Sequence, residues 1–332
     1  MLSPLTDIIR AERDRTVPAY VSLPRYLGGL ALAFLCLQIG TGILLMIYYR
    51  PSIAAAYLST GVIIDEVNLG WLMRSVHRRG ADLVLLLAAF HLVRIFFSRA
   101  YANPRQMTWV SGILLLLVIV AFDLTGVLLP WDQYAYWSTD LLKESLGSVP
   151  LLGHMLVTVL WGGADLGEAG LLRFYAFHIA VLPWVGLFVL AFHLFLVWRF
   201  GLKHPEGSTP RPGILFFPDF LLELFIAFLW TLGLLLSLAI IFPVPLGYEA
   251  DPLAPLEIVQ PRWYLVPLDR LLHVLSTPAV ALLALVAFAA FLFLPMLDAG
   301  AEESARGKSL RLAVVLVVAA AWMLLGVRGY FF

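Results

Sequence analysis

The sequence has little cysteine, little charge and no net charge. Its single cysteine, Cys36, excludes a disulfide, a cysteine-ligated iron–sulfur cluster and a C-x-x-C-H haem attachment within this chain. Charged residues make up only 13% of the chain, and 22 basic residues balance 22 acidic ones, so binding to nucleic acid is not indicated. Hydrophobic residues make up 61%, which is too many for a soluble domain. The composition therefore predicts an all-α integral membrane protein.

Seven apolar runs are long enough to cross a bilayer. They are Leu27–Tyr49, Gly80–Phe97, Met107–Leu129, Phe174–Trp198, Phe220–Phe242, Pro278–Leu297 and Ser309–Val327. A polar stretch rich in proline and glycine separates the first four runs from the last three. We therefore expect a four-helix bundle in residues 1–200, a linker at 201–213 and a three-helix module in residues 214–332. Residues 1–26 have no hydrophobic signal core, and alternate connections are basic, so the N-terminus is predicted to be cytoplasmic.

Two histidine pairs lie inside apolar runs. His77 is separated from His91, and His178 from His193, by close to four helical turns in each case. In an α-helix these intervals rise by about 21 and 22 Å, and the second imidazole is turned by only tens of degrees from the first. The spacing thus predicts two helices that face each other with imidazoles at two depths in the membrane.

Glycines in the neighbouring runs repeat the interval. Gly28 and Gly42 lie in the apolar run before that of the first histidine pair, and Gly112 and Gly126 lie in the run after it. A missing side chain at such positions lets a flat macrocycle approach the backbone. A lone membrane histidine commonly bonds to a neighbouring helix instead. Two matched pairs with matching glycines favour bis-histidine ligation of two stacked haems.

Several motifs resemble cytochrome b of the Rieske/cytochrome bc complexes. The similarity is closest to the plastid and cyanobacterial form, here with its cytochrome b and its subunit IV fused at residues 201–213, and it covers nearly the whole chain. The motifs are RSVHRR (Arg74–Arg79), FHLVR (Phe90–Arg94), TWVSG (Thr108–Gly112), TGVLLPWDQ (Thr125–Gln133), RFYAFH (Arg173–His178) and DPLAPLEI (Asp251–Ile258).

The resemblance implies an antiparallel four-helix bundle with two non-covalent b-type haems. It assigns His77 and His178 to an outer, low-potential haem and His91 and His193 to an inner, high-potential haem. The plastid form also carries a covalent haem on a cysteine, but that position is Tyr26 here, so no covalent haem is expected.

Four arginines match positions near the haems in the family. Arg74 and Arg78 correspond to residues that pair with propionates of the outer haem, and Arg94 and Arg105 are candidates near the inner haem. The alternative is that these arginines are interfacial anchors at helix ends.

The resemblance also implies a reaction and partners. In the family, quinol binds at the outer face and gives one electron to a Rieske protein and the other to the haems, and the inner haem reduces quinone. Asp219 matches an acid of the inner quinone site, although it can also be a favourable charge at a helix N-terminus. Expected partners are membrane lipids, a Rieske-type or other redox subunit, a c-type cytochrome and a second copy in a dimer, in a bacterial cytoplasmic membrane.

The outer quinol motif departs from the family. Where relatives have P-E-W-Y, this chain has Pro261-Arg262-Trp263-Tyr264. A glutamate can accept a quinol proton, whereas arginine stays protonated. We expect Arg262 to stabilise an ionised Asp123 in the third run, and Asp123 or Glu257 to replace the missing glutamate beside Tyr264.

A second acid, Asp82, also lies within a run. A membrane carboxylate must pair, protonate or face water. Arg79 and Arg262 are the cations available by sequence position, and Arg79 lies less than one turn from Asp82 on the same helix. Asp82 is therefore expected either to pair with Arg262 or to form a local pair with Arg79 that has no catalytic role.

The primary interpretation is a di-haem cytochrome b subunit of a bacterial quinol-oxidising respiratory or photosynthetic complex, in which transmembrane electron transfer is coupled to proton translocation. The alternative is a derived cytochrome b with a lost or rebuilt outer quinol site, which receives electrons from a non-Rieske partner. Arg262 favours the alternative, and PWDQ and Tyr264 favour the primary interpretation. A haem-carrying scaffold and a transporter fit less well, because stacked bis-histidine pairs suit conduction and no inverted repeat is evident.

Overall fold

A computed structural model of the protein describes residues 16–17, 23–163, 165–201, 213–257, 259–297 and 305–331. Apart from its two end residues, the expected linker at 201–213 lies outside the described residues.

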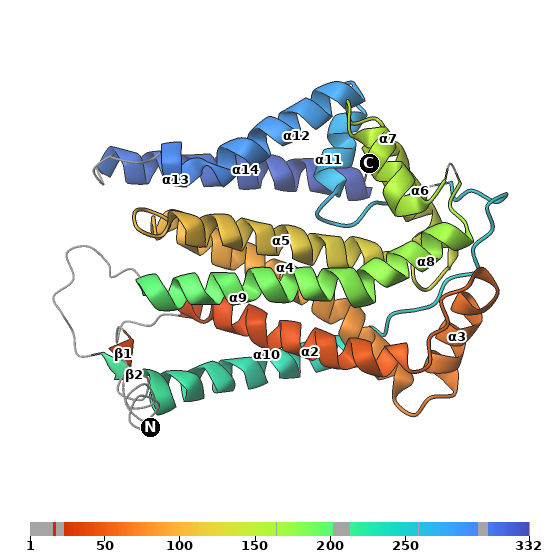
Figure 1. Ribbon diagram of the computed structural model, residues 1–332, viewed down its shortest axis with the longest axis horizontal. Coiled ribbons are helices and arrows are strands. Elements are labelled where there is room, and N and C mark those ends of the chain that lie inside the picture. The colour runs from red at the N-terminus through yellow and green to blue at the C-terminus, as the bar shows by residue number, and fades with distance from the viewer. Residues whose placement is uncertain are drawn as a thin grey trace, which may run out of the picture.

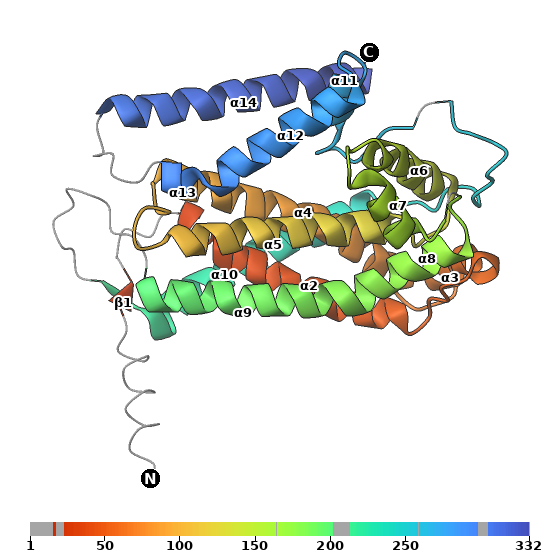
Figure 2. The same ribbon diagram turned by 45° about the horizontal axis from the view of Figure 1, so that its top comes forward.

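Four long helical segments run side by side and form the central bundle (Figures 1 and 2). The fourth of them is continuous from Glu168 to Phe200, with a π-helical turn, η2, in its middle. The segments are α2 (Leu27–Met46), α4 (Gly70–Phe97), α5 (Gln106–Val127) and α8–η2–α9 (Glu168–Ala176, Phe177–Val181 and Leu182–Phe200). Their backbone groups bond within each helix, which a lipid surrounding requires. The predicted bundle is confirmed.

Short elements close the two ends of the bundle. One end carries α3 (Ile53–Asp65), α6 (Gln133–Gly147) and α7 (Gly153–Trp161). At the other end lie η1 (Leu23–Arg25) and a two-stranded antiparallel ribbon of β1 (Thr16–Val17) and β2 (Ile214–Leu215).

The C-terminal helices lie on two sides of the bundle. They are η3 (Phe216–Phe220), α10 (Leu221–Ile241), α11 (Val266–Leu272), α12 (Thr277–Leu292), α13 (Leu294–Leu297) and α14 (Ala305–Phe331). The α10 helix packs against α2 and α4, whereas α12 and α14 approach α4 and α5 from the opposite side (Figure 1). Buried Phe34 of α2, Val84 of α4 and Leu235 of α10 share one apolar core. The described C-terminal helices therefore flank the bundle on two sides.

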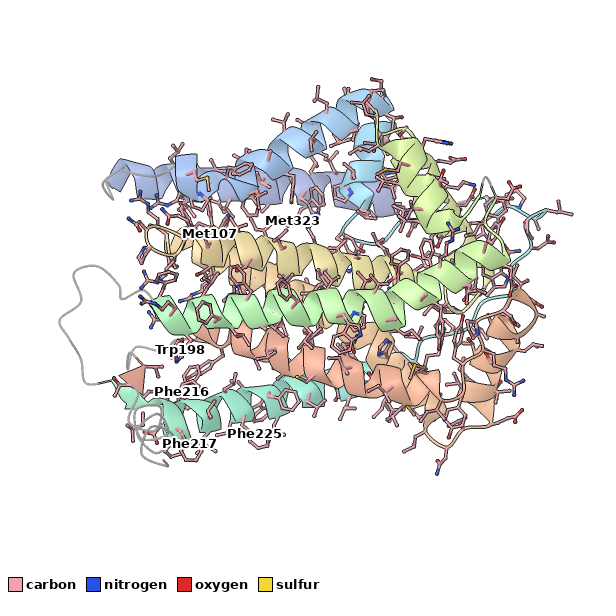
Figure 3. The ribbon with its side chains drawn as sticks, in the orientation of Figure 1. Met107, Trp198, Phe216, Phe217, Phe225 and Met323 are labelled. Carbon is pink, nitrogen blue, oxygen red and sulfur yellow. The ribbon has the colours of Figure 1, made fainter. Side chains whose placement is uncertain are left out.

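Six helical segments in the described ranges are long and apolar enough to cross a membrane. The sixth run expected from the sequence, Pro278–Leu297, forms the shorter α12 and the one-turn α13, and the last run extends into the 27-residue α14. Large apolar side chains are exposed along these helices, which suits a lipid surrounding (Figure 3). Examples are Met107, Trp198, Phe217, Phe225 and Met323. The all-α membrane fold is as predicted.

Candidate functional site

The two histidine pairs form two sites inside the bundle. We call them the first and second haem sites after the ligands predicted from the sequence. The first haem site consists of His77 on α4 and His178 in η2, whose ring centres lie 6.3 Å apart. Two metal–imidazole bonds of about 2 Å each, plus about 1 Å from each nitrogen to its ring centre, give about 6 Å. One iron atom between the rings therefore fits this separation. The second haem site consists of His91 on α4 and His193 on α9, which are close enough to interact electrostatically.

Each predicted glycine lies directly against one of these histidines. A Cβ atom at any of the four would approach an imidazole carbon to between 2.9 and 3.4 Å, closer than or at the limit of ordinary contact. Glycine therefore positions the ring as well as leaving room for a macrocycle, a function that the sequence did not indicate. The pairs are Gly28 with His91, Gly42 with His77, Gly112 with His193 and Gly126 with His178.

Hydroxyl groups hold three of the four rings. Thr41 and Thr125 contact Nδ1 of His77 and His178 at 2.9 and 3.1 Å, and Ser111 contacts Nδ1 of His193 at 2.9 Å. Each hydroxyl donates its own proton to a backbone carbonyl three or four residues earlier. We therefore assign Nδ1–H as the donor to each hydroxyl oxygen, which leaves Nε2 with a free lone pair for a metal.

The sequence carries a signal for these hydroxyls, which were not among the predicted site residues. Thr41, Ser111 and Thr125 each immediately precede one of the predicted glycines. The donor set and the glycine contacts fit a b-type haem at each pair, and the ring separation of His77 and His178 fits the first of them.

The predicted arginines have different partners. Arg74 donates to the backbone carbonyls of Val244 and Pro245, at 2.6 and 3.3 Å. Arg105 donates to the carbonyls of Phe200 and Gly201, at 3.1 and 3.0 Å. These bonds tie the bundle to its connecting segments.

The other two arginines differ from each other. Arg94 is one turn from His91 on α4, close enough to influence it electrostatically. Arg78, in contrast, bonds to two carboxylates. The assignment of propionates to Arg74, Arg78, Arg94 and Arg105 stays a prediction.

Arg262 pairs with both acids of the bundle. Its Nε atom lies 2.7 Å from Oδ2 of Asp123, and one terminal nitrogen bonds to Asp82. The pairing of Arg262 with Asp123 that the sequence predicted is therefore present. Because Arg262 and Asp123 have only 10% and 4% of their side chains exposed, this contact is well shielded from solvent.

Arg78, Trp263 and Tyr264 also contact these acids. We call the six side chains together the Arg262 cluster: Asp82, Asp123, Arg78, Arg262, Trp263 and Tyr264. Arg78 lies 3.2 Å from Asp123 and 3.4 Å from Asp82. The Tyr264 hydroxyl donates to Asp123 at 2.8 Å, and the Trp263 indole donates to Asp82 at 2.9 Å. Two guanidinium groups thus balance two carboxylates.

Of the two cations expected for Asp82, Arg262 bonds to it, whereas the local pair with Arg79 is wrong. Arg79 donates to the carbonyl of Phe242 instead, and Arg78 is the neighbour that pairs with Asp82. Both spacings suit a helix, but Arg78 is on the side of α4 where Asp123 also lies, so it can contact two carboxylates.

Tyr264 is held in its protonated form. Burial raises the pKa of its phenol well above the usual range, and the neighbouring Asp123 carboxylate raises it further. The hydroxyl therefore remains a donor to Asp123 over the whole working pH range.

The PWDQ segment anchors the connection that leads to the cluster. Asp132 caps α6 by accepting a bond from the Ala135 amide at 2.8 Å, and its other oxygen accepts from the Gly247 amide at 3.1 Å. The Gln133 amide donates to Tyr248 at 2.9 Å. The PWDQ segment thus joins the two halves of the chain.

The remaining predicted residues lie elsewhere. Glu257 is exposed and is not part of the Arg262 cluster. Asp219 is exposed in η3, at the opposite end of the bundle from α3. One turn later, Glu223 accepts a hydrogen bond from Tyr26, whose pKa is raised to about 12 by burial and by this carboxylate. Glu223 was not predicted.

Family comparisons cover both halves of the chain. Residues 12–201 match the family described as Cytochrome b/b6/petB, and residues 249–331 match Cytochrome b(C-terminal)/b6/petD.

Two individual relatives and one solved structure are also similar to this chain. A "Cytochrome bc complex cytochrome b subunit" of Chlorobaculum thiosulfatiphilum is 35% identical in an alignment of 330 residues that covers 96% of this chain and 76% of the relative. A "Cytochrome b6" of Picosynechococcus is 37% identical over 193 residues, covering 58% of this chain and 86% of the relative. The solved "Hyperthermophilic respiratory Complex III" superposes with a TM-score of 0.87 at 26% identity, covering 100% of this chain and 92% of that one.

Proposed function

Because the chain belongs to the cytochrome b/b6 family, as a cytochrome b subunit of a bc-type complex, we propose that it moves electrons across the membrane between two quinone sites. The observation that carries the proposal is the set of four imidazoles, each against a glycine and three of them oriented by a hydroxyl. His77 with His178 and His91 with His193 would hold two b haems. The haems supply one-electron transfer when bound.

We further propose that quinol is oxidised beside the Arg262 cluster. A proton acceptor must be ionised before the quinol arrives, and Arg262 with Arg78 favours the ionised form of Asp123. Tyr264 fixes the position of the same carboxylate. Asp123 would then replace the glutamate of the family motif, with the exposed Glu257 as the second candidate to carry the proton to the surface.

The alternative is a rebuilt site that oxidises no quinol. It is favoured by one observation, the contact of Arg262 with both carboxylates, since both acids then already have a cationic partner. In that case electrons enter from a non-Rieske subunit, and the chain reduces quinone at its other end.

Either function needs partners. We propose a Rieske-type or other redox subunit, a c-type cytochrome and a dimeric complex in a bacterial cytoplasmic membrane, with the N-terminus inside. The exposed aromatic residues of α9, such as Trp184 and Phe188, offer an apolar face for lipid or a second copy.

A redox titration of the purified complex tests the proposal. We expect two b-haem transitions, haem reduction by added quinol, and loss of that reduction with an inhibitor of the outer quinol site. Haem reduction that the inhibitor leaves unchanged would favour the alternative, and a single transition would contradict the di-haem assignment.

Asp219→Asn tests the other quinone site. We expect haem reoxidation by quinone to slow about tenfold or more, because the amide cannot deliver a proton, while both haem spectra stay unchanged. Stopped-flow absorbance measures this rate. Asp65→Asn is a matched control, since Asp65 is an exposed acid on α3 at the opposite end of the bundle. Unchanged reoxidation in Asp219→Asn would show that this carboxylate is only a helix-end charge.

A further inference from the structure

The four predicted haem ligands are not hydrogen-bonded alike. In the first haem site both rings have a hydroxyl partner at Nδ1, from Thr41 and Thr125. In the second haem site only His193 has one, from Ser111. Nδ1 of His91 is buried and has no hydrogen-bond partner among the described residues.

Leu27 explains this difference. The residue before the facing glycine is a threonine or a serine at the other three rings, but it is Leu27 before Gly28. On α2, Thr41 and Gly42 lie beside His77. Leu27 and Gly28 occupy the equivalent positions beside His91, close to four helical turns earlier on the same helix. A hydroxyl at position 27 would therefore lie relative to His91 as Thr41 lies relative to His77.

A hydroxyl that accepts from Nδ1–H changes the opposite nitrogen of the ring. It draws the Nδ1 proton toward itself, so Nε2 becomes a stronger electron donor to a bound metal. A stronger donor stabilises ferric over ferrous iron and lowers the reduction potential. Two such bonds act on the first haem site and one acts on the second.

We propose that Leu27 raises the reduction potential of the second haem site above that of the first, because its side chain offers no hydroxyl to accept a hydrogen bond from Nδ1 of His91. The proposal rests on the ligand assignment of the proposed function. With haems bound, one electron would pass from the first site, which would be oxidised, to the second, which would be reduced, and no other reactant would be needed. Leu27 is thus a positioning residue that acts through His91.

Leu27→Thr tests the proposal against Leu27→Val, which has nearly the same shape as threonine without the hydroxyl. Potentiometric titration of the purified complex, followed in the visible haem bands, is expected to place the second site at a more negative potential in L27T than in L27V. The equilibrium constant for electron transfer from the first site to the second should fall by about threefold to tenfold, the range of one hydrogen bond. The transition that disappears in His77→Ala is assigned to the first site, and the remaining transition is assigned to the second site.

Thr41→Val gives an independent measurement at the first site. It should raise the potential of that site, whereas Thr41→Ser, which keeps the hydroxyl, should leave it near the wild-type value. Equal potentials in L27T and L27V with both haems bound, or an unchanged first site in T41V, would overturn the proposal. Both results leave the ligand assignment intact, which haem loss in the histidine variants tests separately.

Discussion

Replacing His77 or His178 by alanine is expected to remove one of two haems and to leave the other. Each haem would depend on its own pair of rings, and the two sites are separated by about four helical turns along the ligand-bearing helices. Loss of one axial nitrogen removes the bond that orients and retains the macrocycle. Pyridine haemochrome analysis of the purified protein should therefore show half of the wild-type haem content.

His154→Ala is the control for this experiment, because His154 is exposed on α7, outside the bundle. It should keep the full haem content. Two haems per chain in both His77→Ala and His178→Ala would refute the ligand assignment, and loss of all haem in every bundle variant would indicate a folding defect instead. His91→Ala distinguishes these cases, since it should retain the transition that His77→Ala loses.

Arg262→Glu, which restores the residue of the family motif, is expected to impair quinol oxidation by at least about tenfold. The substitution would place three carboxylates around the single cation Arg78 in a shielded site. Breaking a buried ion pair while leaving its partner charged costs about 3–5 kcal/mol, so the substitution should slow quinol oxidation and destabilise the site. Steady-state quinol oxidation measures the first effect, and haem content measures the second.

Arg79→Gln is a matched control, because it removes a neighbouring cation that bonds to Phe242 and not to the cluster. Its turnover should stay near wild type. Faster quinol oxidation in Arg262→Glu would contradict the replacement scheme. So would an Asp123→Asn variant with a normal rate and a normal pH profile, since the amide cannot accept the proton.

The approach of the two histidine pairs was largely predictable because it depends on helical periodicity. His77 and His91 share one helix, and an interval close to a whole number of turns brings them to one face regardless of what surrounds them. The apolar runs predicted the bundle for a similar reason, since lipid leaves few alternatives to helices.

The contacts of the Arg262 cluster were only partly predictable. The sequence suggested that Arg262 and Asp123 compensate each other, but the choice of Arg78 over Arg79 depends on Asp123, which belongs to another helix. The position of α10, across the bundle from α12 and α14, likewise follows from tertiary packing rather than from any local pattern.

The Arg262 cluster also constrains how the chain is assembled during synthesis. Asp82 and Asp123 enter the membrane with only Arg78 beside them, two negative charges against one positive, and balance is reached when Arg262 arrives 139 residues after Asp123. Until then the nascent bundle carries an uncompensated charge at the membrane, which is costly. The N-terminal half expressed without Arg262 is therefore expected to be less stable than the same half within the whole chain.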